Sequence, residues 1–177
     1  RSEDFVIVHM ELHACFGARL AEVARDGAVA EQEWRRRVAV VLVEAGLPAA
    51  WLRTAVEAAR GVESAVAEQV APLASADAVE VGRHVLAVDE YDLWKPAVVA
   101  RVSGDAIDVK LQGWQDQKGL PRTKALVVAS DGVGALLRVA ASVGNAGLVD
   151  ALLAKGVNFL VADERANTPL HLAAAAG

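Results

Sequence analysis

The sequence predicts an α+β multidomain protein with an N-terminal helical bundle, a small antiparallel β-barrel and a C-terminal α-solenoid of helical repeats. Three observations predict this order. Apolar residues recur every three to four positions in the first segment, alternate with polar residues in the middle segment, and return to helical spacing in the last segment, which repeats itself. The expected boundaries are 1–72 for the helical domain, 73–79 for a linker, 80–130 for the barrel and 131–177 for the repeats.

Composition limits the classes of function. The chain has 177 residues, of which 54% are hydrophobic and 23% charged, so we expect it to fold. Its net charge of −5 gives no long-range attraction for nucleic acid or for an anionic membrane surface. The single cysteine, Cys15, excludes an internal disulfide framework. No apolar run approaches the roughly 20 residues of a membrane helix, so we expect no transmembrane segment.

The first domain is expected to contain about three helices. Ser2 is a candidate N-cap followed by acidic residues, and helical apolar spacing then continues to Val23. A second helix is expected over 31–48, where Gly46 ends it, and a third over 49–70. Three helices with short connections favour a small bundle.

The middle segment is expected to form a curled sheet. Gly104 lies in a tight turn that joins two of its strands. Four or five short strands in about 50 residues favour a small antiparallel barrel over a sandwich. The expected strands lie near 83–88, 95–102, 106–111 and 124–129.

Residues that could carry chemistry are few. His9 and His13 stand four positions apart on one helical face, with Cys15 close by, which is a spacing that metal ligands use. No further acidic or histidine ligand has the spacing to complete a site, so we interpret this group as structural and expect no metal and no cofactor. Because no Ser-His-Asp or Cys-His set can be assembled, we expect no catalytic residue.

The last segment repeats itself with a period of 33 residues. "ALLRVAA" (135–141) aligns with "TPLHLAA" (168–174). The segment resembles the ankyrin repeat family, with "ALLRVAASVGNAGLVDALLAKGVNFLVADERAN" as one complete copy and "TPLHLAAAAG" as the first helix of a truncated second copy. We therefore expect further repeats beyond Gly177, or a partner that covers the face they would cover.

The ankyrin resemblance implies roles for individual residues. Partners of this family bind through loop tips and inner helices, which gives a set of candidate partner-binding residues. Thr168 would cap a helix, Pro169 would occupy its first turn, Leu170 would point into the stack, and His171 would brace adjoining loops through a hydrogen bond. The candidate partner-binding residues are Arg138, Asn145, Ala146 and Arg165.

The middle segment is similar to the Tudor/chromo-barrel group through Asp92, Trp94, Ala97 and Val99, followed by Val109, Gly113 and Trp114. Members of this group bind methylated lysine or arginine in an aromatic cage, since a methylammonium prefers an aromatic face to water. Carried over by position, the candidate cage residues are Tyr91, Trp94 and Trp114, with Asp92 or Asp116 as the anion. The alternative, which we favour, is that Trp94 and Trp114 fill the interior of the barrel.

Every expected module is a recognition fold. The sequence therefore predicts a non-enzymatic scaffold that binds a partner protein through its ankyrin repeats, with the barrel and the helical domain as further docking surfaces. One alternative is an accessory subunit of a large assembly in an organelle such as the chloroplast. It depends on position 1 being Arg and on a barrel-then-ankyrin order similar to that of the chloroplast signal-recognition-particle subunit. Two further alternatives are a methyl-lysine or methyl-arginine chromatin reader and the non-catalytic part of a larger enzyme such as a ubiquitin ligase.

Overall fold

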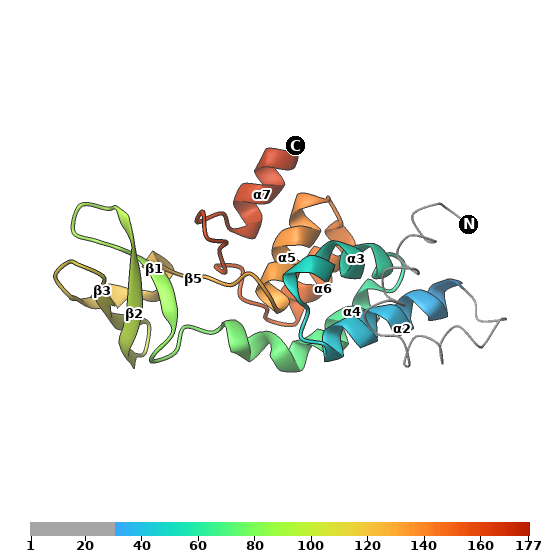
Figure 1. Cartoon of the computed structure of the whole chain (residues 1–177), viewed down its shortest axis with the longest axis horizontal. Helices are drawn as coiled ribbons and strands as arrows, with labels where there is room; N and C mark the ends of the chain where they lie inside the picture. Colours follow the sequence, from blue (N-terminus) through green and yellow to red (C-terminus); the bar gives the residue numbers. More distant parts are fainter. Residues whose placement is uncertain (1–30) are drawn as a thin grey trace.

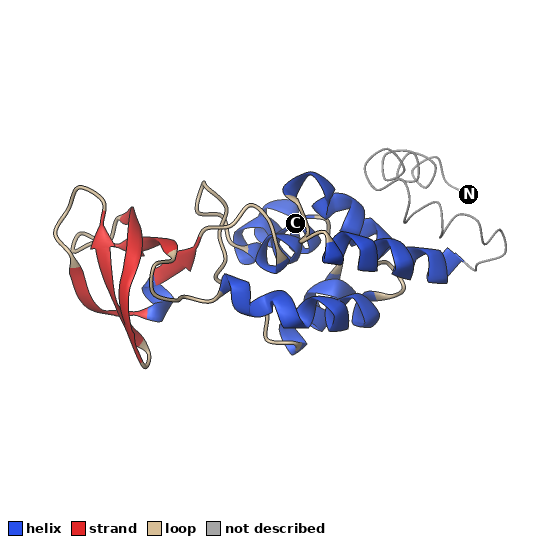
Figure 2. Cartoon of the chain, turned by 60° about the horizontal axis from the view of Figure 1, so that its bottom comes forward, coloured by secondary structure: helices blue, strands red, loops and turns tan. Residues whose placement is uncertain are grey.

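In the computed structural model, which describes residues 31–177, a small sheet lies at one end of the molecule and the helices lie together at the other (Figures 1 and 2). The strands are β1 (His84–Val88), β2 (Trp94–Ser103), β3 (Ala106–Leu111), β4 (Gln117–Pro121) and β5 (Ala125–Val127). The α-helices are α2 (Glu31–Glu44), α3 (Leu52–Ala58), α4 (Glu63–Val70), α5 (Val133–Ser142), α6 (Ala146–Ala154) and α7 (Pro169–Ala176). Short 3-10 helices are η1 (Ala49–Trp51), η2 (Ala71–Asp77) and η3 (Arg122–Lys124).

The helices that precede the sheet in sequence share one apolar core with the helices that follow it. α3 lies along α5, α4 lies along α6, and α2 packs against both α3 and α4. Each fully buried leucine stabilises the fold by about 1.5–3 kcal/mol. The leucines that meet in this core are Leu42 of α2, Leu47, Leu52 of α3, Leu136 and Leu137 of α5, and Leu148 and Leu152 of α6.

The expected α+β multidomain architecture is therefore wrong. The helices of 131–177 do not form an ankyrin solenoid of their own, because α5 and α6 bury their apolar faces against α2, α3 and α4. The described residues form one small domain with a five-stranded antiparallel sheet and six α-helices. A period of 33 residues predicts where helices fall, but it does not say which segment covers their apolar faces.

The sheet is open. Its strand order is β4-β3-β2-β1-β5, and each neighbouring pair is antiparallel. β4 and β5 form its two edges, and no ladder joins them in the described residues, so the segment expected to be a small antiparallel barrel forms an antiparallel sheet of five strands. The inward side chains alternate along each strand, as a pleated strand requires. They form the second core, which includes Val85, Ala97, Val99, Ile107, Val109 and Val127.

Local sequence accounts for most element boundaries. The four expected strands are confirmed as β1, β2, β3 and β5, and Gly104 in the β2–β3 turn has a φ of 59°. The helix expected over 49–70 is divided, because Gly61 adopts a φ of 80° between α3 and α4. The helix expected to reach Val23 lies outside the described residues.

Two segments attach the sheet to the helices. Val161, which follows α6, belongs to the core of the sheet and lies against Gly134 of α5. The neighbouring Ala162 pairs with Val128 in a parallel bridge just after β5. The second segment is the expected linker 73–79, most of which is η2 and which includes the buried Asp77.

Candidate functional site

The sheet presents a concentration of exposed apolar side chains. Of the nine large apolar side chains known to be exposed in the described part of the chain, four lie in the loops or at the strand ends of the β1–β2–β3 meander. A single exposed apolar residue is ordinary, but several gathered on one surface mark an interaction site. Three of them, Tyr91, Leu93 and Trp94, lie at the hairpin loop between β1 and β2, and the fourth, Trp114, lies in the loop between β3 and β4.

The hairpin loop that joins β1 to β2 is held in a fixed shape. Asp89 Oδ1 accepts hydrogen bonds of 2.9 Å from the backbone N–H groups of Tyr91 and Leu93. Asp89 N–H in turn donates to the Leu93 carbonyl at 2.9 Å. Lys124 Nζ lies 3.1 Å from Asp92 Oδ1, which ties the loop to η3. The exposed Tyr91 and Leu93 therefore project from an ordered turn.

The side of the sheet that faces away from its core carries an apolar surface, which we call the outer face. It consists of Leu86, Trp94, Pro96 and Val98, which alternate with the inward residues of β1 and β2. Leu86 stands opposite Pro96 on β2, so the surface crosses β1 and β2, while Leu126 opposite Leu86 on β5 is buried. Trp94 and Pro96 are exposed, while Leu86 and Val98 are half-buried.

The predicted aromatic cage is not assembled. Trp94 and Lys95 are consecutive in β2 and so point to opposite sides of the sheet. Lys95 Nζ lies 4.6 Å from the centre of the Trp114 ring, so the neighbour of this ring is a residue that leaves β2 on the side opposite to Trp94. A cation of the chain already occupies that ring. The candidate anion Asp92 pairs with Lys124, and Asp116 is exposed in the β3–β4 loop.

The expectation that both tryptophans fill the barrel interior is also wrong. Trp94 is 43% exposed and Trp114 is 51% exposed. The interior is filled by smaller side chains, chiefly valine and alanine, and Leu120 of β4 packs against them. Five short strands enclose too little space for two indole rings, which bury some 150–250 Å² each.

Two of the four predicted partner-binding residues are buried. Arg138 is 5% exposed and Asn145 is 7% exposed, so neither can contact a partner. Ala146 and Arg165 are exposed, one at the start of α6 and the other in the loop before α7. The four residues therefore do not form one surface.

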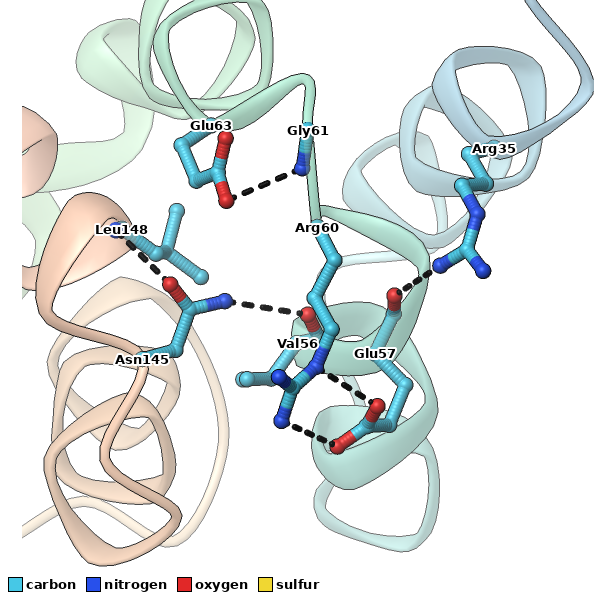
Figure 3. Close-up of polar contacts among 8 residues, drawn as sticks. All are labelled: Arg35, Val56, Glu57, Arg60, Gly61, Glu63, Asn145 and Leu148. Atoms are coloured by element: carbon cyan, nitrogen blue, oxygen red, sulfur yellow. Dashed lines mark hydrogen bonds and ion pairs between the residues drawn. The ribbon is translucent and has the colours of Figure 1, made fainter. Parts of the chain in front are cut away.

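Asn145 has a structural role, which Figure 3 shows. Its side-chain oxygen accepts a hydrogen bond of 3.1 Å from Leu148 N–H and so caps α6. Its side-chain amide donates to the Val56 carbonyl at 3.4 Å, on the neighbouring helix α3. The Asn145 side chain thus caps the N-terminus of α6 and connects α6 to α3.

The predicted ankyrin residues all lie at the start of α7. Thr168 is its N-cap, and Pro169 is its first residue. His171 Nδ1 lies 2.8 Å from Thr168 Oγ1 and accepts a hydrogen bond of 3.3 Å from Thr168 N–H. His171 therefore braces its own helix start, not an adjoining loop. Leu170 is 78% exposed, so it does not pack into a stack with the residues that the structure describes.

A buried charged cluster joins the helices to the sheet, and the sequence did not reveal it. Asp77 is 3% exposed, and its Oδ2 accepts a hydrogen bond of 2.6 Å from Gly134 N–H at the start of α5. Arg83 lies 3.7 Å from Asp77 Oδ1. Burial raises the pKa of Asp77, although the Gly134 hydrogen bond and the charges of Arg83 and Arg138 act in the other direction.

Arg138 is the cation at the centre of this cluster. Its Nη2 donates to the Ala129 carbonyl, while its Nη1 is buried without a hydrogen-bond partner among the described residues. Burial lowers the pKa of Arg138, and Asp163 and Asp77 oppose this effect. Burial works against ionisation of Asp163, but hydrogen bonds from Asn167 and Arg165 and the charge of Arg138 hold its pKa below the usual value. This network connects structural elements, and we assign it no ligand.

An open hollow of about 480 Å³ lies between the start of β1 and the end of β5. Arg83, His84 and Ser130 contribute to its lining. Two of its charged groups are engaged elsewhere: Arg83 with Asp77, and Asp131 with the backbone N–H of Ala49 at 2.6 Å. The hollow therefore offers few free groups to a ligand.

Other classes of site receive little support in the described part of the chain. Within residues 31–177, no three His, Cys, Asp or Glu side chains are close enough to hold a metal ion. His9, His13 and Cys15 lie outside those residues. None of the helices that the structure describes is both long enough and apolar enough to cross a membrane.

Comparisons of the chain with protein-family models, with curated proteins and with solved structures found no match. The resemblances to ankyrin repeats and to the Tudor/chromo-barrel group therefore stay predictions from motifs.

Proposed function

We propose that this chain is a non-enzymatic protein-binding module and that its partner protein docks on the outer face of the sheet. The observation that carries the proposal is the exposure of Trp94 at 43%, beside Pro96 on the same face. Tyr91 at 66% and Leu93 at 53% extend the apolar surface along the hairpin loop. Aromatic side chains are enriched where proteins bind proteins, since they bury a large area with few rotatable bonds.

The rigidity of the surface supports docking. The two strands that carry it, β1 and β2, are hydrogen-bonded to each other, and Asp89 fixes the adjoining loop through two backbone N–H groups. A partner would therefore bind without the entropic cost of ordering this loop. An accessory subunit of a larger assembly would use the same surface. A methyl-lysine reader receives less support, because Lys95 of the chain itself lies over the Trp114 ring.

Co-purification of the tagged full-length chain from cells of its own source tests the proposal. We expect a partner at a fixed stoichiometry, which Trp94→Ala and Val98→Glu both remove. Phe159→Ala is the matched control, since Phe159 is 60% exposed but lies in the loop after α6. The same partner in all four preparations, or none in the wild type, would contradict docking on the outer face.

A further inference from the structure

We infer that the segment that docks on the outer face is an acidic amphipathic peptide, with large apolar side chains at one end and carboxylates at the other. This inference rests on the proposed function and adds the chemistry of the partner. It follows from two features of the sheet: a gradient from aromatic to basic residues along the outer face, and edges that do not favour an added strand.

The strand register shows the gradient. At one end of the outer face Trp94 stands opposite Val88, next to the hairpin loop with Tyr91 and Leu93. At the other end Val98 stands between His84 on β1 and Lys110 on β3. Both His84 and Lys110 are exposed.

The basic end carries an excess of positive charge. Lys110 and Lys118 are exposed and form no ion pair with the residues that the structure describes, and Lys118 lies close enough to Asp108 to affect its pKa. Asp108 accepts 2.9 Å hydrogen bonds from Gly119 N–H and from Arg101, and these contacts hold its pKa below the usual value. Two cations, Arg101 and Lys118, therefore lie near this one carboxylate, and Lys110 adds a further positive charge on the outer face. A partner with carboxylates at this end would complement the surplus charge.

The edges of the sheet are poor sites for adding a strand. On the β5 side, Ala162 N–H donates to the Val127 carbonyl at 2.8 Å and the Ala162 carbonyl accepts from Ala129 N–H at 3.1 Å, so the segment around Ala162 covers that edge. On the β4 side, Gly119 has a φ of 65° and Pro121 lacks an N–H. A charged residue, a proline and a bulge are the features that protect exposed edges from pairing, and the β3–β4 register shifts between Ile107 and Val109.

Synthetic peptides test the chemistry directly. The first probe is a fluorescein-labelled peptide of 12 residues that carries Leu and Val at alternating positions of its first half and four Glu in its second half. The second has four Lys in place of the four Glu. With the full-length chain at low salt, we expect the Glu peptide to bind about tenfold more tightly than the Lys peptide in fluorescence anisotropy. This preference should shrink at 0.5 M salt, since exposed charges are screened.

Variants assign the two ends of the surface. Trp94→Ala should weaken both peptides, and Lys110→Glu with Lys118→Glu should remove the preference for the Glu peptide. Phe159→Ala and Arg53→Glu are matched controls, since both residues are exposed on the helical part, and they should change neither affinity. Equal binding of the two peptides, tighter binding of the Lys peptide, or no binding of either would overturn the inference.

The outer face could instead bind a membrane or a second copy of this chain, and the experiments distinguish these two cases. Binding to phosphatidylserine vesicles without binding of the Glu peptide would assign the surface to a membrane and overturn the inference. A dimer in sedimentation that Trp94→Ala dissociates would assign it to a second copy and would also overturn it. If the Glu peptide fails but Trp94→Ala still removes the co-purified partner, the acidic chemistry is wrong and the proposed function stands. If Trp94→Ala changes neither the peptide affinities nor the co-purification of the partner, the inference and the proposed function are both wrong.

Discussion

The carboxylate of Asp77 accepts a hydrogen bond of 2.6 Å from the backbone N–H of Gly134, a residue 57 positions further along the chain. Asp77 lies at the end of η2, just before the sheet begins, and Gly134 lies in the first turn of α5, just after the sheet ends. The bond therefore closes the chain at the junction where it enters and leaves the sheet. A carboxylate in the first turn of a helix also interacts favourably with the helix dipole.

The stability of the fold should depend on the protonation of Asp77. Because burial raises the pKa of Asp77 in the folded chain, the folded state holds this proton more tightly than the unfolded chain does. The contribution of Asp77 to the free energy of unfolding then falls as pH rises from the ordinary carboxyl value, about 4, through the raised value. Above the raised value it is constant.

Asp77→Asn measures this contribution, because the amide can accept the Gly134 hydrogen bond but does not titrate. We expect the difference in unfolding free energy, wild type minus Asp77→Asn, to decrease as pH rises from about 4 and then to level off. Urea titrations of both proteins between pH 4 and 7 give this difference, in which the other titrating groups cancel. A difference that increases with pH would contradict the raised pKa.

Gly134 should not tolerate a side chain. A Cβ at this position would lie 2.6 Å from Val161 Cβ, and neither the helix nor the sheet core can move freely away. We expect Gly134→Ala to lower the free energy of unfolding by about 1–3 kcal/mol, which is typical of overpacking. Gly147→Ala is the matched control in α6, where a Cβ would meet Glu63 Cγ at 3.5 Å, an ordinary contact.

Gly147→Ala should be neutral or stabilising by up to about 1 kcal/mol, since alanine favours helix more than glycine does. Chemical denaturation of the two variants and the wild type makes the comparison. If Gly134→Ala is as stable as Gly147→Ala, then α5 does not pack on Val161 as described.

Asn145 should contribute through two separable hydrogen bonds. Asn145→Ser keeps an oxygen that can cap α6 but loses the donor to the Val56 carbonyl, and Asn145→Ala loses both. We expect stability to fall in the order wild type, Ser, Ala, with about 1 kcal/mol for the cap and a further loss of about 1–3 kcal/mol for the unpaired buried carbonyl. Thermal unfolding of the three proteins gives the order, and an alanine variant equal to the serine variant would show that the cap contributes nothing.

Trp94 should matter little for stability. Its side chain is 43% exposed, so Trp94→Ala should change the free energy of unfolding by less than about 1 kcal/mol. Ile107→Ala, in the core of the same sheet and 1% exposed, should cost about 2–5 kcal/mol. Urea denaturation compares the two variants. A large loss with Trp94→Ala would mean that the indole is part of the interior.

The sequence contained more information about Trp94 than its residue type suggests. Ala97 and Val99 are small, apolar and inward, and Trp94 has the opposite parity along the strand. The alternation therefore predicts an outward Trp94, whereas the general preference of tryptophan for buried positions predicts the reverse. The strand positions were predictable for the same reason, because alternation is a local signal. β4 was not predictable, because its sequence contains Lys118, Gly119 and Pro121, which are residues typical of turns.

Contacts between distant segments could not be predicted. The spacing of apolar residues indicated helices in 31–70 and 131–177, but not that α5 and α6 would pack against α3 and α4. Likewise, the Arg138 guanidinium looked like an exposed group on a repeat, because nothing local shows that Asp77 and Asp163 would approach it. Whether a side chain is buried depends on the assembled fold, so it can be predicted from a single sequence only indirectly.

Site-specific photocrosslinking tests docking on the outer face most directly. The full-length chain would carry p-benzoylphenylalanine in place of Trp94, and a matched chain would carry it in place of Phe159, each irradiated in cells of its own source. Both positions are exposed aromatic residues, one on the outer face and the other in the loop after α6. We expect an adduct of one defined mass from position 94 and none of that mass from position 159. The absence of an adduct from position 94, or the same adduct from both positions, would contradict docking on the outer face.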